Sequence, residues 1–81
     1  MSARHIEKLW QTYKKVLPKD AGATQIIETR RAFFAGAGGL YECILNILEP
    51  GTEATDNDLK RMDEINAELH EFVSLIKNGV A

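Results

Sequence analysis

The chain has 81 residues and a formal net charge of −2, with 44% hydrophobic and 27% charged residues. This length and composition are typical of one globular domain and exclude a disordered chain. A domain this small buries only about 60% of its unfolded surface, which favours self-association as a supplement to its core.

The cysteine and histidine content limits the chemistry of the chain. The single Cys43 excludes an internal disulfide, and two histidines are too few for a typical zinc site. This usage fits a reducing cytoplasm, which is the location that we expect. The uncharged run 32–41 is far shorter than the roughly 20 residues of a membrane-spanning helix, so no membrane span is expected. A membrane-surface role is not expected either, because the apolar face of the predicted first helix is needed for the core.

Charge is distributed unevenly along the chain. Residues 1–31 carry seven Lys or Arg against three acids, whereas residues 32–81 carry three against nine. The basic first part predicts either an anionic partner or neutralisation by the acidic second part, within one fold or between subunits. Duplex nucleic acid is not expected, because the whole chain is acidic and no helix carries a continuous basic face.

The first predicted helix covers about residues 3–17. Apolar side chains recur in it at helical spacing, and Ser2 is available as its N-cap. Pro18 ends this helix, because the residue before a proline avoids the α region. Residues 19–23 then form a short connection.

The second predicted helix covers about residues 25–48. Thr24 is its expected N-cap, and Pro50-Gly51 stops the helical pattern. One side of this helix is a wide apolar band in which Phe33 and Leu40 lie seven residues apart. Such a band is broad enough to contact both of the other helices.

The opposite side of the same helix consists of small residues. Glycine inside a helix costs about 0.5–1 kcal/mol relative to alanine, and close approach of another backbone or of a ligand usually offsets that cost. We expect this side to pair with the same helix of another subunit, the alternative being that one of the other helices covers it in a monomer. The predicted oligomer interface consists of Ala32, Gly36, Gly39 and Cys43.

The third predicted helix covers about residues 56–77. Thr55 and Asp58 have the spacing of a capping box, with Asp in place of the usual Glu, and Asn78-Gly79 is the expected C-cap. One face is apolar, and a flank of acids is solvated. The three segments together predict an all-α, three-helix domain over residues 1–81, with two long antiparallel helices and an amphipathic first helix, that self-associates.

The spacing of polar residues offers no catalytic constellation. Ser74 stands where a second histidine would complete a zinc-binding motif begun by His70-Glu71. Cys43 lies among apolar residues, where a thiol is usually inert. We therefore expect no enzyme activity, no catalytic residue, no metal site and no cofactor.

Binding chemistry concentrates where the first two predicted helices meet. Aromatic rings beside guanidinium and ammonium groups suit a base and a phosphate together. The alternative places Trp10 and Tyr13 in the core, with the arginines paired to acids of residues 56–77. The candidate ligand-binding residues are Trp10, Tyr13, Lys14, Arg30, Arg31 and Phe34.

Residues 10–37 carry a resemblance. The run from Trp10-x-x-Tyr13 and Leu17-Pro18 to Gln25-x-x-Glu28-x-Arg30-Arg31-Ala32-Phe33-Phe34-Ala35-Gly36-Ala37 resembles small helical proteins encoded by phages and prophages. The likeness extends to the acid-rich third helix. It implies a phage-encoded protein in the host cytoplasm.

A more distant similarity is to the helical-hairpin sponges with which phages sequester cyclic nucleotide alarm signals, the anti-CBASS and anti-Thoeris type. Those proteins are small, helical and oligomeric, and they use aromatic and basic residues at subunit boundaries. Tyr13 and either Arg30 or Arg31 occupy comparable places here. The full third helix and the Ala/Gly-rich middle segment depart from that pattern.

The leading functional hypothesis is a sponge that binds a cyclic nucleotide defence signal without turning it over. Tyr13 or Trp10 stacks on a base in this hypothesis, the cations hold phosphates, and Phe34 forms a wall. The alternative is a protein-interaction module that inhibits or adapts a host or virion protein through the acids Glu64, Glu68 and Glu71 of the third helix.

Overall fold

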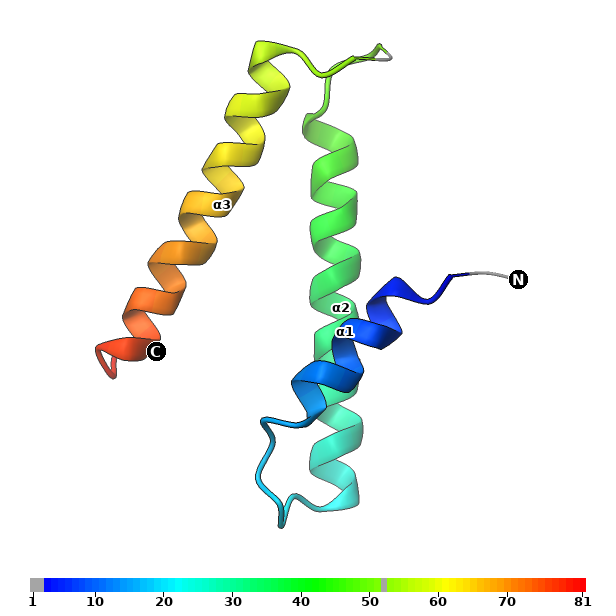
Figure 1. The fold of residues 1–81 in the computed structure, drawn as a ribbon, viewed down its shortest axis with the longest axis vertical. Coiled ribbons are helices and arrows are strands. Elements are labelled where there is room, and N and C mark those ends of the chain that lie inside the picture. Colours follow the sequence, from blue (N-terminus) through cyan, green and yellow to red (C-terminus); the bar gives the residue numbers. More distant parts are fainter. Residues whose placement is uncertain (1–2, 52) are drawn as a thin grey trace. The chain divides into compact units, whose positions relative to one another are not determined.

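The computed structural model describes residues 3–51 and 53–81, and these residues form three α-helices and no strand. The helices are α1 (His5–Lys14), α2 (Ala23–Ile47) and α3 (Asp56–Lys77) (Figure 1). The all-α prediction and the three helices are therefore confirmed. Contacts divide the chain into two compact units, one up to Glu42 and one from Cys43 onward.

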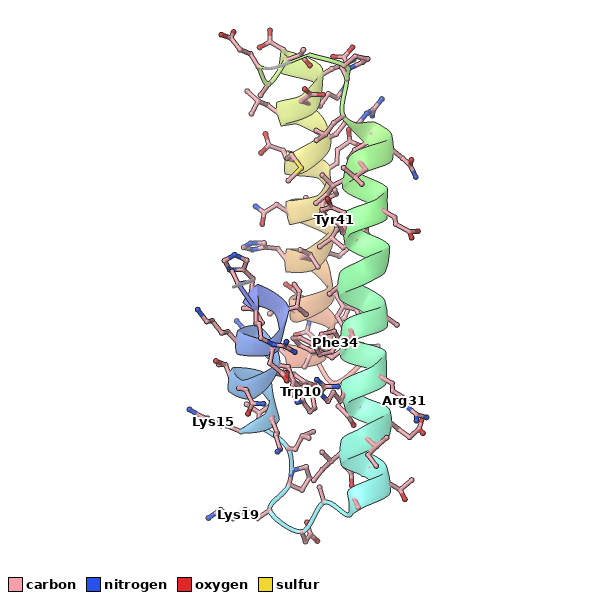
Figure 2. The ribbon with its side chains drawn as sticks, turned by 90° about the vertical axis from the view of Figure 1, so that its right-hand side faces the viewer. Trp10, Lys15, Lys19, Arg31, Phe34 and Tyr41 are labelled. Carbon is pink, nitrogen blue, oxygen red and sulfur yellow. The ribbon has the colours of Figure 1, made fainter. Side chains whose placement is uncertain are left out.

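In the first unit, α1 lies against the first half of α2 (Figures 1 and 2). Trp10 is the residue that joins them, because it is only 2% exposed and packs against Phe33 of α2. Many other apolar side chains of this unit remain about half exposed, among them Leu9 and Tyr41. The core of the unit is thus a single indole with its neighbours.

The ends of the first two helices differ from the predicted ones. α1 stops at Lys14 because the N–H groups of residues 15–17 donate to carbonyls three residues back, at 2.9–3.3 Å, in the tighter 3₁₀ pattern. The predicted cap at Ser2 lies outside the described residues. The predicted cap at Thr24 is wrong, since α2 already begins at Ala23 and the carbonyl of Gly22 accepts the N–H of Ile26 at 3.1 Å. Gly22 thus holds the N-cap place, where glycine is tolerated.

The second unit begins with the last turn of α2 and continues into α3. The predicted capping box is confirmed: Thr55 Oγ1 accepts the N–H of Asp58 at 3.0 Å, and the Asp58 carboxylate accepts the N–H of Thr55 at 3.1 Å. The same carboxylate accepts the N–H of Glu49 at 2.8 Å. Asp58 is only 5% exposed and therefore ties the loop after α2 to the first turn of α3.

The predicted C-cap of α3 is also confirmed. Asn78 is the C-cap residue, and Gly79 follows with φ of 73°, the left-handed conformation that favours glycine. The N–H of Gly79 donates to Ile76 and that of Val80 to Leu75, both at 3.0 Å. These two bonds form a Schellman motif, which satisfies carbonyl groups at the end of the helix.

Across the described ranges, no helix combines the length and the apolar character that crossing a bilayer requires.

The loop contact of Asp58 predicts an acid-sensitive second unit. The backbone N–H groups of Glu49 and Thr55 hold the pKa of the Asp58 carboxyl below its ordinary value of 3.8. A lowered pKa stabilises the fold at any pH above the ordinary value, and this contribution is lost as the pH falls through the lower, folded value. Asp58→Asn should lower the urea midpoint of the helical circular dichroism signal at pH 7, and the difference from the wild type should shrink below about pH 4.

Asp56→Asn is the matched control, because Asp56 occupies the same first turn but accepts none of the hydrogen bonds that hold this loop. Equal loss of stability in the two variants at pH 7 would contradict the role given to Asp58.

Candidate functional site

The aromatic residues predicted to meet a ligand largely pack against one another. The ring centroid of Phe33 lies 5.6 Å from that of Trp10 and 5.4 Å from that of Tyr13, the second pair being stacked. Trp10 is buried and presents no open ring face, whereas Tyr13 is 44% exposed. Tyr13 is therefore the more accessible of the two rings predicted to stack on a base.

Arg30 connects the two helices of the first unit. Its Nη2 atom lies 3.0 and 3.3 Å from the two carboxylate oxygens of Glu7 on α1. Its guanidinium carbon also lies 4.7 Å from the centroid of the Phe34 ring, in a cation–π contact. The structure thus brings Arg30 and Phe34 together, as the site prediction requires, and adds an acid that was not part of it.

The remaining predicted cations lie elsewhere. Arg31 points away from α1 (Figure 2) and pairs with Glu28 of its own helix at 3.3 Å. Lys14 is the exposed last residue of α1. Both arginines therefore pair with acids of α1 and α2, and not with acids of residues 56–77 as the alternative prediction had it.

Two adjoining hollows lie beside Phe34 in the first unit, and both are lined by Phe34 and Ile6. One, of about 280 Å³, is mainly apolar and is completed by Ala37, Gly38 and Tyr41. The other, of about 310 Å³, contains the charged or titratable side chains of the α1 start and is completed by Ala3, Arg4, His5 and Glu7. An apolar hollow with two aromatic rings thus adjoins one that carries Arg4 and His5 together with the Glu7 carboxylate.

The residues that line these hollows were not all singled out from the sequence. Phe34 and Tyr41 lie seven residues apart in the apolar band of α2, and Gly38 lies between them at helical spacing. That periodicity was a usable signal for this side of the helix. No sequence signal indicated that the start of α1 would reach it.

The predicted interface residues lie on the exposed side of α2. In the part of the chain that the structure describes, a Cβ at Gly36 or Gly39 would meet nothing within 4 Å outside its own helix. Ala32 and Cys43 are exposed as well. Because α1 packs on the other side, α1 does not cover this small-residue side.

Cys43 contributes to a further hollow, within the second unit. This hollow of about 540 Å³ is lined by both helices of the unit, and Arg61 and Glu64 at its edge form an ion pair of 3.0 Å. Among the described residues, no group of three or more His, Cys, Asp or Glu side chains is arranged to hold a metal ion. The lining residues are Cys43, Asn46, Ile47, Arg61, Glu64, Ile65 and Glu68.

The burial of Trp10 predicts a structural role that can be measured directly. Replacing a buried tryptophan by alanine costs about 3–5 kcal/mol, so Trp10→Ala should unfold α1 from α2 or the whole first unit. Tyr13→Ala should lose much less stability, because the Tyr13 side chain is already half exposed. Urea titration followed by circular dichroism compares the two variants, and equal losses would contradict the structural role of Trp10.

No known protein family matches the sequence, and no characterised protein or solved structure shows significant similarity to the chain. The resemblance to small phage proteins and to the hairpin sponges therefore stays a prediction.

Proposed function

We propose that the protein is a non-catalytic binding protein that captures a nucleotide in the two hollows beside Phe34, as a phage-type sponge for a cyclic nucleotide defence signal. The observation that supports this proposal is that an aromatic, apolar hollow and a hollow lined by Arg4, His5 and Glu7 share the side chains of Phe34 and Ile6. A nucleotide has the same division into an aromatic base and an anionic phosphate.

The apolar hollow suits the base. Phe34 and Tyr41 supply aromatic surface, and stacking on an aromatic side chain contributes about 1–3 kcal/mol per base. Gly38 carries no side chain, and a Cβ there would meet nothing within 4 Å, so a flat ring can approach the backbone of α2. Together the two hollows fall within the range of about 300–1,000 Å³ that ligand pockets occupy.

The second hollow suits the phosphate. Arg4 and His5 line it, and Arg30, which is not part of the lining, contacts two lining residues, Phe34 and Glu7. Guanidinium groups hold phosphate oxygens through charge-assisted hydrogen bonds. The phosphate site of this proposal is thus built around Arg30, with Tyr13 and Lys14 at the far end of α1 left for a larger ligand.

Assembly is part of the proposal. The exposed side of Ala32, Gly36 and Gly39 suits close pairing with α2 of a second copy, because small residues let two helix backbones approach. Cys43, the fourth predicted interface residue, is exposed but also lines the hollow that α3 shares. Among the described residues, a Cβ at Gly36 or Gly39 would meet nothing within 4 Å outside its own helix. A second copy therefore supplies the contact that offsets their cost in helix stability.

The glycines of α2 separate ligand binding from assembly. Gly38→Leu should fill the apolar hollow and abolish binding of cyclic di- and trinucleotides, measured by calorimetry, while the helix gains about 0.5–1 kcal/mol from the loss of a glycine. Gly36→Leu places the same side chain on the opposite side of α2, so it should dissociate the assembly in sedimentation experiments and leave nucleotide binding intact.

The absence of heat for every nucleotide with the wild-type protein at micromolar concentration would reject the proposal. Loss of binding in Gly36→Leu would show that the site needs a second copy, against the single-chain site described above. A wild-type protein that is monomeric in sedimentation experiments would contradict the proposed pairing of two copies through α2.

A second candidate function is a protein-interaction module that uses α3. Half-exposed apolar side chains run along one face of this helix, including Leu59 at 56% and Leu69 at 56%. Residues 56–77 also carry six acids against three basic residues. The matching partner is an apolar protein surface with a basic rim, from a host or virion protein that this chain inhibits or adapts, facing Glu64, Glu68 and Glu71.

Phe72→Ser tests this second function, because it removes a large side chain from that face. Burying a phenylalanine contributes about 1.5–3 kcal/mol, so the variant should retain roughly tenfold less of a stoichiometric partner protein in affinity capture. Val80→Ser removes an apolar side chain that lies beyond the end of α3 and is 71% exposed, against 54% for Phe72, and this variant should retain the partner in full. Equal retention by both variants would rule out this face of α3.

A further inference from the structure

We infer that Glu7 sets the charge selectivity of the site by occupying Arg30 as an internal anion that a ligand phosphate must displace. This inference rests on the proposed nucleotide site and adds its ligand class, namely nucleotides with at least two phosphate groups. The juxtaposition that carries it is that the Glu7 carboxylate lines the proposed phosphate hollow and is also hydrogen-bonded to Arg30.

The geometry makes Glu7 a competitor for Arg30. Both Glu7 oxygens lie within 3.3 Å of Nη2, so the carboxylate already neutralises the guanidinium. The side chains of Arg30 and Glu7 are 46% and 26% exposed, which leaves the pair open to an incoming anion. The contact uses one guanidinium nitrogen, and an arginine has five N–H donors, so Arg30 keeps donors that a phosphate can approach first.

The negative charge of Glu7 also acts directly on a ligand. A phosphate in the hollow of Arg4 and His5 lies beside the Glu7 carboxylate, which lines the same hollow. Two like charges a few ångströms apart repel, and the repulsion is screened only in part at a half-exposed site. Removal of this charge with retention of the hydrogen-bond acceptor should therefore strengthen phosphate binding roughly threefold to tenfold.

The ligand class follows from the charge balance. When the first phosphodiester of a ligand replaces Glu7 as the partner of Arg30, one singly charged anion replaces another, so the contact adds little binding free energy. A second phosphate adds charge that Glu7 does not offset and that the other basic side chains of the unit can hold. A nucleoside has no phosphate, so Arg30 adds nothing to its binding free energy. Cyclic di- and trinucleotides carry two or three phosphodiesters and fit this requirement.

The chain contains a matched control for Glu7. Glu28 pairs with Arg31 at 3.3 Å, on a part of α2 that points away from α1 (Figure 2). Glu7→Gln and Glu28→Gln make the same change of net charge, and each removes the charge that pairs with one arginine. Only Glu7→Gln changes the hollow, and its amide oxygen still accepts a hydrogen bond from Arg30.

The first experiment uses inorganic phosphate as the probe, followed by NMR of the backbone amides of α1 and α2. The resonances around Arg4, His5 and Arg30 should shift at roughly threefold to tenfold lower phosphate concentration in Glu7→Gln than in the wild type or in Glu28→Gln. The emission of Trp10 reports that each variant is folded. Equal midpoints for the two variants would overturn the inference whether or not the protein binds nucleotides.

The second experiment uses calorimetry with cyclic di-AMP and cyclic di-GMP, and with adenosine and guanosine as uncharged references. Glu7→Gln should raise the affinity for a cyclic dinucleotide and leave that for the nucleosides unchanged. A gain for the nucleosides of the same size would overturn the charge mechanism. A phosphate effect with no binding of any cyclic nucleotide would keep the role of Glu7 and reject the proposed function.

Discussion

The packing of Trp10 against Phe33 is the contact on which the first unit depends. Trp10 is 2% exposed, while the apolar residues around it in α1 and α2 are open to solvent to a much greater degree. A buried indole contributes more apolar area than any other side chain, so one tryptophan can hold a ten-residue helix against its neighbour. The position of Glu7 and of the start of α1 beside Phe34 follows from that contact.

The second unit also depends on a single side chain, which here makes a polar contact. The Asp58 carboxylate accepts two backbone N–H groups and is buried, so the loop after α2 and the first turn of α3 are joined by one side chain. Hydrogen bonds to a charged acceptor are about twice as strong as neutral ones. Thr55 strengthens the same junction, because its hydroxyl donates to the Glu49 carboxylate.

Because only one of the described side chains in each unit is buried, much apolar surface stays exposed, and the proposed functions all use that surface. Large exposed apolar patches mark binding surfaces in soluble proteins. The apolar side of α2 provides the hollow at Gly38, the small-residue side provides a surface for a second copy, and α3 provides an apolar face flanked by acids. A chain of 81 residues thus presents several surfaces, because few of its side chains are needed for its own core.

Local chemistry in the sequence was sufficient to predict the three helices, the capping box of Thr55 and Asp58, and the glycine cap at Gly79, because each depends on residues within a few positions of one another. The start of α2 was predicted wrongly, because Gly22 and Thr24 are both residue types that occur as N-caps and only the backbone geometry shows which one precedes the helix. Tertiary structure decided that Trp10 is buried, that Arg30 faces Glu7 while Arg31 faces Glu28, and that the start of α1 meets Phe34. Those facts depend on how one helix is rotated against another. Sequence periodicity predicts only the broad face that makes the contact, whereas side-chain packing determines which individual residues meet.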